Sequence, residues 1–273
     1  MARKKKAGIV AVASEAEEVL YEDHDGVARV TINRPERHNS MSWGVVEGLR
    51  GAFDRAKHDS AVRVVVLAGA GEKSFCAGAD LSGMVEGGGF LALHKARGEL
   101  AGFFTDLWEL GKPTIARVQG YALAGGFGLA LACDLIVASE RATFGVPEIG
   151  VGLWPYMVTV PMLRAMPAKK ALELIMTGRR VSAEEAERIG FLSQVVPPGE
   201  LDAAVEELAT SLASRSPAVM KLGRDSFYKV LDAGTREALG YLHAMLTVTA
   251  MTEDAAEGTA AFSEKRPPTW RGR

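Results

Sequence analysis

The sequence predicts an α/β fold followed by an all-helical C-terminal region. Strand and helix patterns alternate up to the Pro197-Pro198 pair, and only helix patterns follow it. The chain has 273 residues, enough for one large core with an appendage. We therefore expect an α/β core over residues 19–198, a helical region over residues 199–273, and a disordered or flexible tail over residues 1–18.

The first part of the core contains two strand patterns around one helix. Val27–Ile32 alternates as a strand does, and Pro35 and Asn39 after it are incompatible with a helix. A helix then begins at Ser42, with apolar residues repeating at a period of 3.6. The apolar run Val62–Leu67 is typical of a buried strand, and the loop AGAGEKSFCAGADLSG follows it.

The same order of elements returns further along the chain. Thr114–Val118 is predicted as a strand, a glycine-rich turn leads to a helix from about Gly126, and Leu135–Ala138 is predicted as the next strand. This alternation indicates layers of helices and strands. The glycines of EGGGF (residues 86–90) predict a mobile loop.

The later helices have clear boundary signals. Ser182 with Glu185 forms a capping box, and Gly190 suits the left-handed residue that ends a helix. Beyond residue 198 we expect three helices, over Leu201–Arg215, Ala218–Leu231 and Thr235 to about Glu257. The last carries an apolar stripe, Leu239, Leu242, Met245 and Leu246, which would pack on the core or on another subunit.

Composition and charge exclude several classes of partner. The net charge is −2, and 48% of residues are apolar and 24% charged, so neither nucleic acid nor a membrane is favoured. No apolar run approaches the length of about 18 to 20 residues that a spanning helix needs. Cys76 and Cys133 lie in apolar stretches, which suits a reducing compartment, and we expect a cytoplasmic protein.

Common catalytic motifs are absent from the sequence. The five histidines have no metal-ligand spacing, so no metal is expected, and there is no G-x-S-x-G elbow. GFGLAL (residues 126–131) fails the dinucleotide fingerprint at its last position. Two loops of small residues remain, FCAGADL (75–81) and YALAGGFGLALACDL (121–135). Both would let a ligand approach the main chain, and converging N–H groups there would form an oxyanion hole, although close packing is the more usual reason for such residues.

Three blocks resemble the signature of a known family. FCAGADL, KPTIARVQGYALAGGFGLALACDLIVAS and ATFGVPEIGVGL closely resemble the enoyl-CoA hydratase/isomerase (crotonase) family, in its order and spacing. VTINRPERHNSM, TGRRVSAEEAERIGFLSQVV and AFSEKRPPTW are similar too, so the resemblance runs from about Val19 to Trp270. It implies a crotonase-like spiral of ββα units, an acyl-CoA thioester substrate, and a homotrimer or homohexamer built on the C-terminal helices. No cofactor is implied beyond the CoA of the substrate.

The resemblance also implies catalytic roles. The matching positions for the two backbone N–H groups that hold the thioester oxygen are Ala79 and Gly125. Family hydratases usually have two glutamates: the second matches Glu148, and the first would fall at Gly128. With one carboxylate, the favoured chemistry is an isomerase-type shift of a double bond, with Glu148 desolvated as both base and acid. Three alternatives stay open, namely a 2-enoyl-CoA hydratase of fatty acid β-oxidation, a non-catalytic acyl-CoA-binding homologue, and a merely structural Glu148.

The remaining substrate contacts are expected by position. In GLWPYMVTV, Trp154 and its bulky neighbours would shape an acyl pocket or simply belong to the core. Ala77, Asp80 and Leu81 share the first loop, where Asp80 would cap backbone N–H groups and Leu81 begins the segment in which family members often have a phosphate-binding lysine. For CoA, the candidates are Arg37, Phe262 and Lys265, the last reaching the ligand of a neighbouring subunit.

Overall fold

The computed structural model describes residues 17–80 and 90–273 of the chain. The expected flexible tail over residues 1–16, the loop over residues 86–89 and the binding candidate Leu81 lie outside these ranges. Glu17 and Glu18, at the end of the expected tail, are tied to the core, because their carbonyl oxygens accept hydrogen bonds from Asn33.

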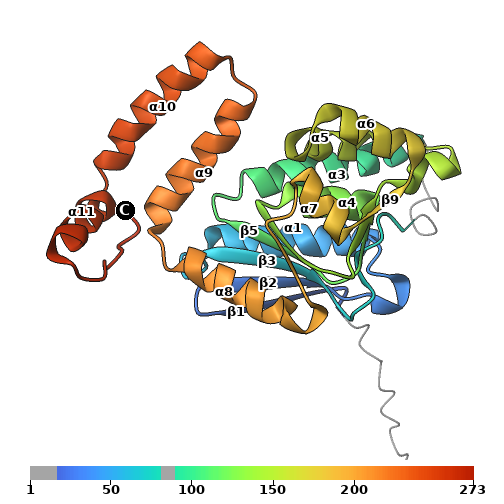
Figure 1. Cartoon of the computed structure of the whole chain (residues 1–273), viewed down its shortest axis with the longest axis horizontal. Coiled ribbons are helices and arrows are strands. Elements are labelled where there is room, and N and C mark those ends of the chain that lie inside the picture. The colour runs from blue at the N-terminus through green and yellow to red at the C-terminus, as the bar shows by residue number, and fades with distance from the viewer. Residues whose placement is uncertain (1–16, 81–89) are drawn as a thin grey trace, which may run out of the picture.

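The core contains two sheets (Figure 1). The larger has the order β1-β2-β3-β5-β7-β10 and is parallel except at the β1–β2 pair. The smaller has the order β4-β6-β8-β9 and is parallel except at β8–β9. The strands are β1 (Val19–His24), β2 (Val27–Ile32), β3 (Val64–Gly69), β4 (Ser74–Cys76), β5 (Thr114–Val118), β6 (Tyr121–Leu123), β7 (Leu135–Ser139), β8 (Thr143–Gly145), β9 (Arg180–Ser182) and β10 (Gln194–Val196).

Successive strand pairs give one strand to each sheet. The pairs β3–β4, β5–β6 and β7–β8 repeat this pattern, and a helix follows each pair, so the chain winds as a spiral of ββα units. This confirms the fold that the sequence predicts. The helices of the core are α1 (Trp43–His58), α3 (Phe90–Trp108), α4 (Gly125–Ala132), α5 (Tyr156–Ala165), α6 (Ala168–Thr177) and α7 (Ala183–Ile189), with 3-10 turns η1 (Pro35–Arg37) and η2 (Pro147–Val151).

Local signals explain the two best-predicted helices. Ser42 caps α1 by accepting a hydrogen bond from the Val45 N–H, at 3.1 Å. Ser182 caps α7 through the Glu185 N–H, and Gly190 ends α7 with a φ of 98°. Both helices therefore begin with a side chain that satisfies an otherwise unpaired N–H group.

The main core lies between the two sheets and the helices around them. A second cluster lies on the other face of the large sheet, where Leu201, Val205 and Ala209 of α8 (Leu201–Ala213) pack on β2, β3, β5 and β7. A 3-10 turn, η3 (Pro198–Glu200), leads into α8. The helix α8 thus covers the large sheet, although it lies in the expected helical region.

The last three helices form an arm that extends from the core (Figure 1). They are α9 (Pro217–Leu231), α10 (Thr235–Ala250) and α11 (Glu253–Glu264). The prediction of one helix from Thr235 to about Glu257 is wrong. The helix α10 ends at its C-cap residue Met251, and Thr252 caps a new helix by accepting a hydrogen bond from the Ala255 N–H. The buried carboxylate of Asp254 accepts hydrogen bonds from the backbone N–H groups of Arg271 and Gly272.

A buried polar cluster joins the arm to the core. Arg224 of α9 donates to Asp134 at 2.8 Å and to the carbonyl oxygens of Leu107 and Trp108 at the end of α3, each at 2.8 Å. Tyr228 donates its hydroxyl to the other oxygen of Asp134. In the part of the chain that the structure describes, no helix is both long enough and apolar enough to cross a membrane.

Candidate functional site

Two backbone segments lie against each other at the centre of the site. A Cβ atom on Gly126 would lie 2.1 Å from the carbonyl oxygen of Cys76, and one on Gly78 would lie 2.7 Å from the Cβ of Ala124 and 3.3 Å from the Gly125 nitrogen. Any side chain at Gly78 or Gly126 would separate the segments. The small residues of both loops therefore bring the chain after β4 to the first turn of α4.

The backbone N–H groups of Ala79 and Gly125 lie in this contact. Met41 forms a parallel bridge to Ala79: its N–H donates to the Gly78 carbonyl, and its own carbonyl accepts from the Asp80 N–H. The N–H of Ala79 therefore points away from Met41. Gly125 is the first residue of α4, so its N–H has no acceptor within the helix. Two backbone donors on adjoining segments are the elements of an oxyanion hole.

The turn before α4 has an unusual conformation. Ala124 has φ 52° and ψ −130°, a region that residues with a Cβ rarely adopt. Its N–H donates to the carbonyl oxygen of Gly145 at 2.8 Å. Gly145 ends β8, only two residues before η2, so one hydrogen bond joins the segment that presents Gly125 to the segment that carries Glu148.

Glu148 is a half-buried carboxyl group in η2. Its Oε2 atom is buried and has no hydrogen-bond partner among the described residues. Burial raises the pKa of the Glu148 carboxyl above its ordinary value, and a hydrogen bond from its own backbone N–H opposes this rise. A carboxyl with a raised pKa is suited to taking up and returning a proton near neutral pH.

The position of the absent first glutamate is closed by packing. Gly128 is buried in α4, and a Cβ there would lie 2.9 Å from the ring of Phe104 in α3 and 3.0 and 3.1 Å from the methyl groups of Val158 in α5. Both neighbours are 3% exposed, so neither has solvent to move into. A second carboxylate at this point would have to displace these buried apolar side chains.

Two of the remaining candidates, Ala77 and Asp80, lie in the first loop, and a third, Arg37, lies on the turn next to it. Ala77 donates its N–H to the His38 carbonyl at 3.1 Å, which ties the loop to the turn that follows η1. Arg37, at the end of η1, is exposed on that turn. The Asp80 carboxylate forms an ion pair with Arg34 at 3.0 Å.

Arg34 is a residue that the sequence reasoning missed. Its guanidinium also pairs with Glu18 at 2.8 Å and donates to the carbonyl of Ser40 at 2.8 Å. It thereby fastens the turn at residues 37–41 and the Asp80 loop to the start of the core. The block VTINRPERHNSM contains two arginines, Arg34 and Arg37, and nothing in the local pattern distinguishes the one that forms these contacts.

The remaining candidates lie in two other regions, the segment after η2 and the end of α11. Trp154 is partly buried and packs against the main core, as does Met157, so it contributes to the core while part of its surface stays exposed. Phe262 is 87% exposed at the end of α11, and Lys265 follows in a left-handed conformation. Both belong to the arm, apart from the core in Figure 1.

Within residues 17–80 and 90–273, no three His, Cys, Asp or Glu side chains are grouped so that they could hold a metal ion. Cys76 and Cys133 are buried free thiols, and burial raises the pKa of the Cys76 thiol to about 12.

Known proteins are similar to this chain in sequence and in fold. The family model described as Enoyl-CoA hydratase/isomerase matches residues 22–273. A short-chain-enoyl-CoA hydratase of Clostridium acetobutylicum is 36% identical over 92% of this chain and 97% of its own length. A carnitinyl-CoA dehydratase of Proteus mirabilis is 38% identical over 90% of this chain and 95% of its own. The crystal structure of an enoyl-CoA hydratase from Bacillus anthracis superposes with a TM-score of 0.89 at 32% identity, covering 94% of this chain and all of that one.

The packing around Gly128 predicts opposite effects of alanine at two glycines. Gly128→Ala should lower the free energy of unfolding by about 1 to 3 kcal/mol, because the new methyl group meets Phe104 and Val158. Gly51→Ala in α1, where a Cβ meets nothing within 4 Å, should raise it by about 0.5 to 1 kcal/mol. Denaturant unfolding measures both, and a Gly128→Ala protein as stable as the parent would contradict the closed packing.

The burial of Glu148 predicts a pH-dependent cost to stability. Because its folded-state pKa is raised above 4.5, ionisation disfavours the folded state, and stability falls as pH rises through the folded value. Glu148→Gln should therefore have a higher Tm than the parent at pH 8, and the gain should vanish below pH 4.5. Glu184→Gln, at a side chain 82% exposed, is the control for losing a surface charge. A Tm difference independent of pH would refute the assignment.

Proposed function

Since the chain belongs to the enoyl-CoA hydratase/isomerase family of acyl-CoA enzymes, we propose that it shifts the double bond of a 3-enoyl-CoA to the 2 position. The substrate carries its own CoA, and the proposed chemistry uses no other cofactor. The backbone N–H groups of Ala79 and Gly125 hold the thioester oxygen, and Glu148 moves the proton.

The proposed reaction has two proton transfers on one carboxyl group. The Glu148 carboxylate removes a proton from C2, and the electron pair of the C–H bond moves into the thioester to form an enolate. The negative charge develops on the oxygen that faces the two N–H groups, where a preorganised pair of donors is most effective. The protonated Glu148 then returns the proton to C4, where the electron pair of the 3,4 double bond forms the new C–H bond. The carbon–carbon double bond of the enolate becomes the 2,3 double bond, and the thioester carbonyl re-forms.

The closed packing at Gly128 is the observation that carries this proposal. Hydration of a double bond needs a group to activate water and a group to deliver a proton, and two carboxylates divide these tasks. Here Phe104 and Val158 occupy the space that the side chain of a second acid would enter. A proton moved between two carbons of one substrate requires only Glu148, and its unpaired, buried Oε2 suits that role.

Hydration or dehydration is the second candidate. The relatives named above are a short-chain-enoyl-CoA hydratase and a carnitinyl-CoA dehydratase, and both align over most of this chain. For this reaction Glu148 would be the one carboxylate that activates water, and backbone groups would assist it. An acyl-CoA binder without turnover is the third, since the donors at Ala79 and Gly125 do not depend on Glu148.

The proposal extends to binding and assembly. Arg37, Ala77, Asp80, Leu81 and Trp154 would contact the acyl-CoA from the same chain. Phe262 and Lys265 would contact the acyl-CoA of a neighbouring copy in a cytoplasmic homotrimer or homohexamer. The exposed stripe of α10 supports this assembly: Leu239, Leu242 and Leu246 are all exposed in the single chain, with Leu246 at 69%, and no residue of α10 is buried.

Two substrates separate the candidate reactions. With 3-hexenoyl-CoA, the enzyme should produce the absorbance of a conjugated 2-enoyl thioester, whereas hydration of crotonyl-CoA would remove it. Glu148→Gln should lower kcat for the shift by about 10² to 10⁴-fold, the usual contribution of a general acid–base. Glu184→Gln should keep the parental rate. Turnover of crotonyl-CoA alone would establish hydration as the reaction. Unchanged turnover in Glu148→Gln would show that Glu148 does not move the proton.

The assembly has a test of its own. Sedimentation should give three or six times the 29.1 kDa mass of the chain. Leu246→Glu should reduce the assembly to monomers, because it places a charge in the apolar stripe. Leu20→Glu, at an exposed position of β1 outside the arm, is the matched control. A parental protein that sediments as a monomer would count against the proposed assembly.

A further inference from the structure

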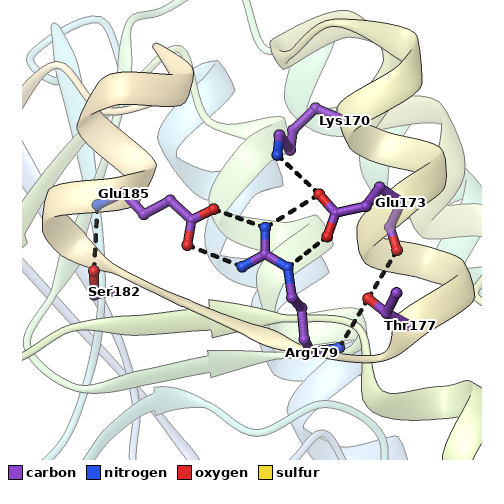
Figure 2. Close-up of polar contacts among 6 residues, drawn as sticks. All are labelled: Lys170, Glu173, Thr177, Arg179, Ser182 and Glu185. Atoms are coloured by element: carbon purple, nitrogen blue, oxygen red, sulfur yellow. Dashed lines mark hydrogen bonds and ion pairs between the residues drawn. The ribbon is translucent and has the colours of Figure 1, made fainter.

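A cluster of four charged side chains lies beside the catalytic region. Arg179, in the turn between α6 and β9, donates to Glu185 of α7 at 2.7 and 2.9 Å and to Glu173 of α6 at 3.1 Å, so it lies between two carboxylates (Figure 2). Lys170 pairs with Glu173 at 2.8 Å. These residues form the Arg179 cluster, in which two positive and two negative side chains balance.

The fork of Arg179 fixes the relative position of α6, β9 and α7. Hydrogen bonds from Arg179 and Lys170 lower the pKa of Glu173 to about 2, and Arg179 also lowers that of Glu185. Both carboxylates are therefore charged at neutral pH. Thr177 extends the arrangement, since it donates to the Glu173 carbonyl at 2.8 Å at the end of α6. Paired forks of this kind specify geometry as well as adding energy.

The turn that carries Arg179 packs directly under Glu148. Gly178 has a φ of 63°, and a Cβ there would lie 2.8 Å from Ile149 and 3.7 Å from the Cα of Pro147. These two residues flank Glu148 in η2. A movement of the turn at 178–179 would therefore move the segment that holds the carboxyl group in its buried position.

The same turn contacts Gly145, which is hydrogen-bonded to the segment that carries Gly125. Arg180 pairs with Gly145 in the β8–β9 ladder, and the Arg179 carbonyl lies 3.1 Å from where a Gly145 Cβ would be. Gly145 in turn accepts the Ala124 N–H at 2.8 Å, immediately before Gly125. One strand end thus touches the Arg179 turn, the Glu148 turn and the start of α4.

We propose that Arg179 is a positioning residue for the reaction, which holds the Glu148 carboxyl and the Gly125 N–H in register through Gly178 and Gly145. The proposal rests on the function proposed above. The side chains of the Arg179 cluster are partly exposed, and exposed ion pairs contribute little to stability. The cluster therefore matters more for geometry than for the free energy of unfolding. Arg179 itself touches no reacting atom.

Arg179→Gln tests this role in the full-length enzyme. With 3-hexenoyl-CoA, kcat should fall by about 10 to 100-fold, the scale of a small misplacement of reacting groups. KM should stay within about threefold, because the proposed CoA contacts lie on other segments. The pH limb that reports Glu148 should move toward lower pH, since a loosened η2 admits water to the carboxyl. Arg188→Gln, which removes the same charge from an exposed pair on α7, should change none of these.

A thermodynamic readout separates this proposal from the assigned reaction. In the Arg179→Gln background, adding Glu148→Gln should give a smaller gain in Tm at pH 8 than it gives in the parent, because Glu148 is already hydrated. This comparison holds even where the parent turns over neither substrate, an outcome that defeats the proposed function alone. If Arg179→Gln does not fold, Glu185→Gln removes one carboxylate and should show the same changes at smaller size. Unchanged kcat, pH profile and Tm gain in the variant that folds would overturn the proposal.

Discussion

The contact between the backbone after β4 and the first turn of α4 is the constraint on which the site depends. Gly126 lies so close to the Cys76 carbonyl that no side chain fits between them, and Gly78 approaches Ala124 in the same way. This approach places the Ala79 and Gly125 nitrogens on adjoining segments. Its cost is visible in Ala124, whose φ of 52° is strained for a residue with a Cβ, by about 1 to 3 kcal/mol.

A second unfavourable feature lies in η2, which follows the strand β8. Glu148 is held in a half-buried position with an unpaired oxygen, where ionisation opposes folding. Both unfavourable features meet at Gly145, which accepts the Ala124 N–H and pairs with Arg180. The surrounding ladder and core must therefore outweigh them, and the Arg179 cluster acts where the two meet. Strain at a functional site persists only when neighbouring structure fixes it in this way.

Features with local causes were predictable from the sequence. Ser42 and Ser182 cap their helices as expected, and β2 matches its predicted range. The strands of the small sheet, three residues each, lack enough residues to show a period, and they form only because distant segments pair. The long helix expected from Thr235 failed because Thr252 competes as a cap. The site positions came from the resemblance, whereas the contacts of Gly128 and Arg179 join segments whose proximity no local pattern encodes.

At position 128 the site differs in its packing as well as in the absence of a carboxylate. Its place is filled by Phe104 from α3 and Val158 from α5, two elements that approach α4 from separate parts of the chain. A carboxylate restored at 128 alone would meet both side chains, and it would also bury a charge beside apolar groups. Smaller residues at 104 and 158 would relieve both contacts. The absence of a second carboxylate from the candidate site is therefore tied to the packing of three helices, and the chemistry proposed for Glu148 depends on that packing as much as on its own burial.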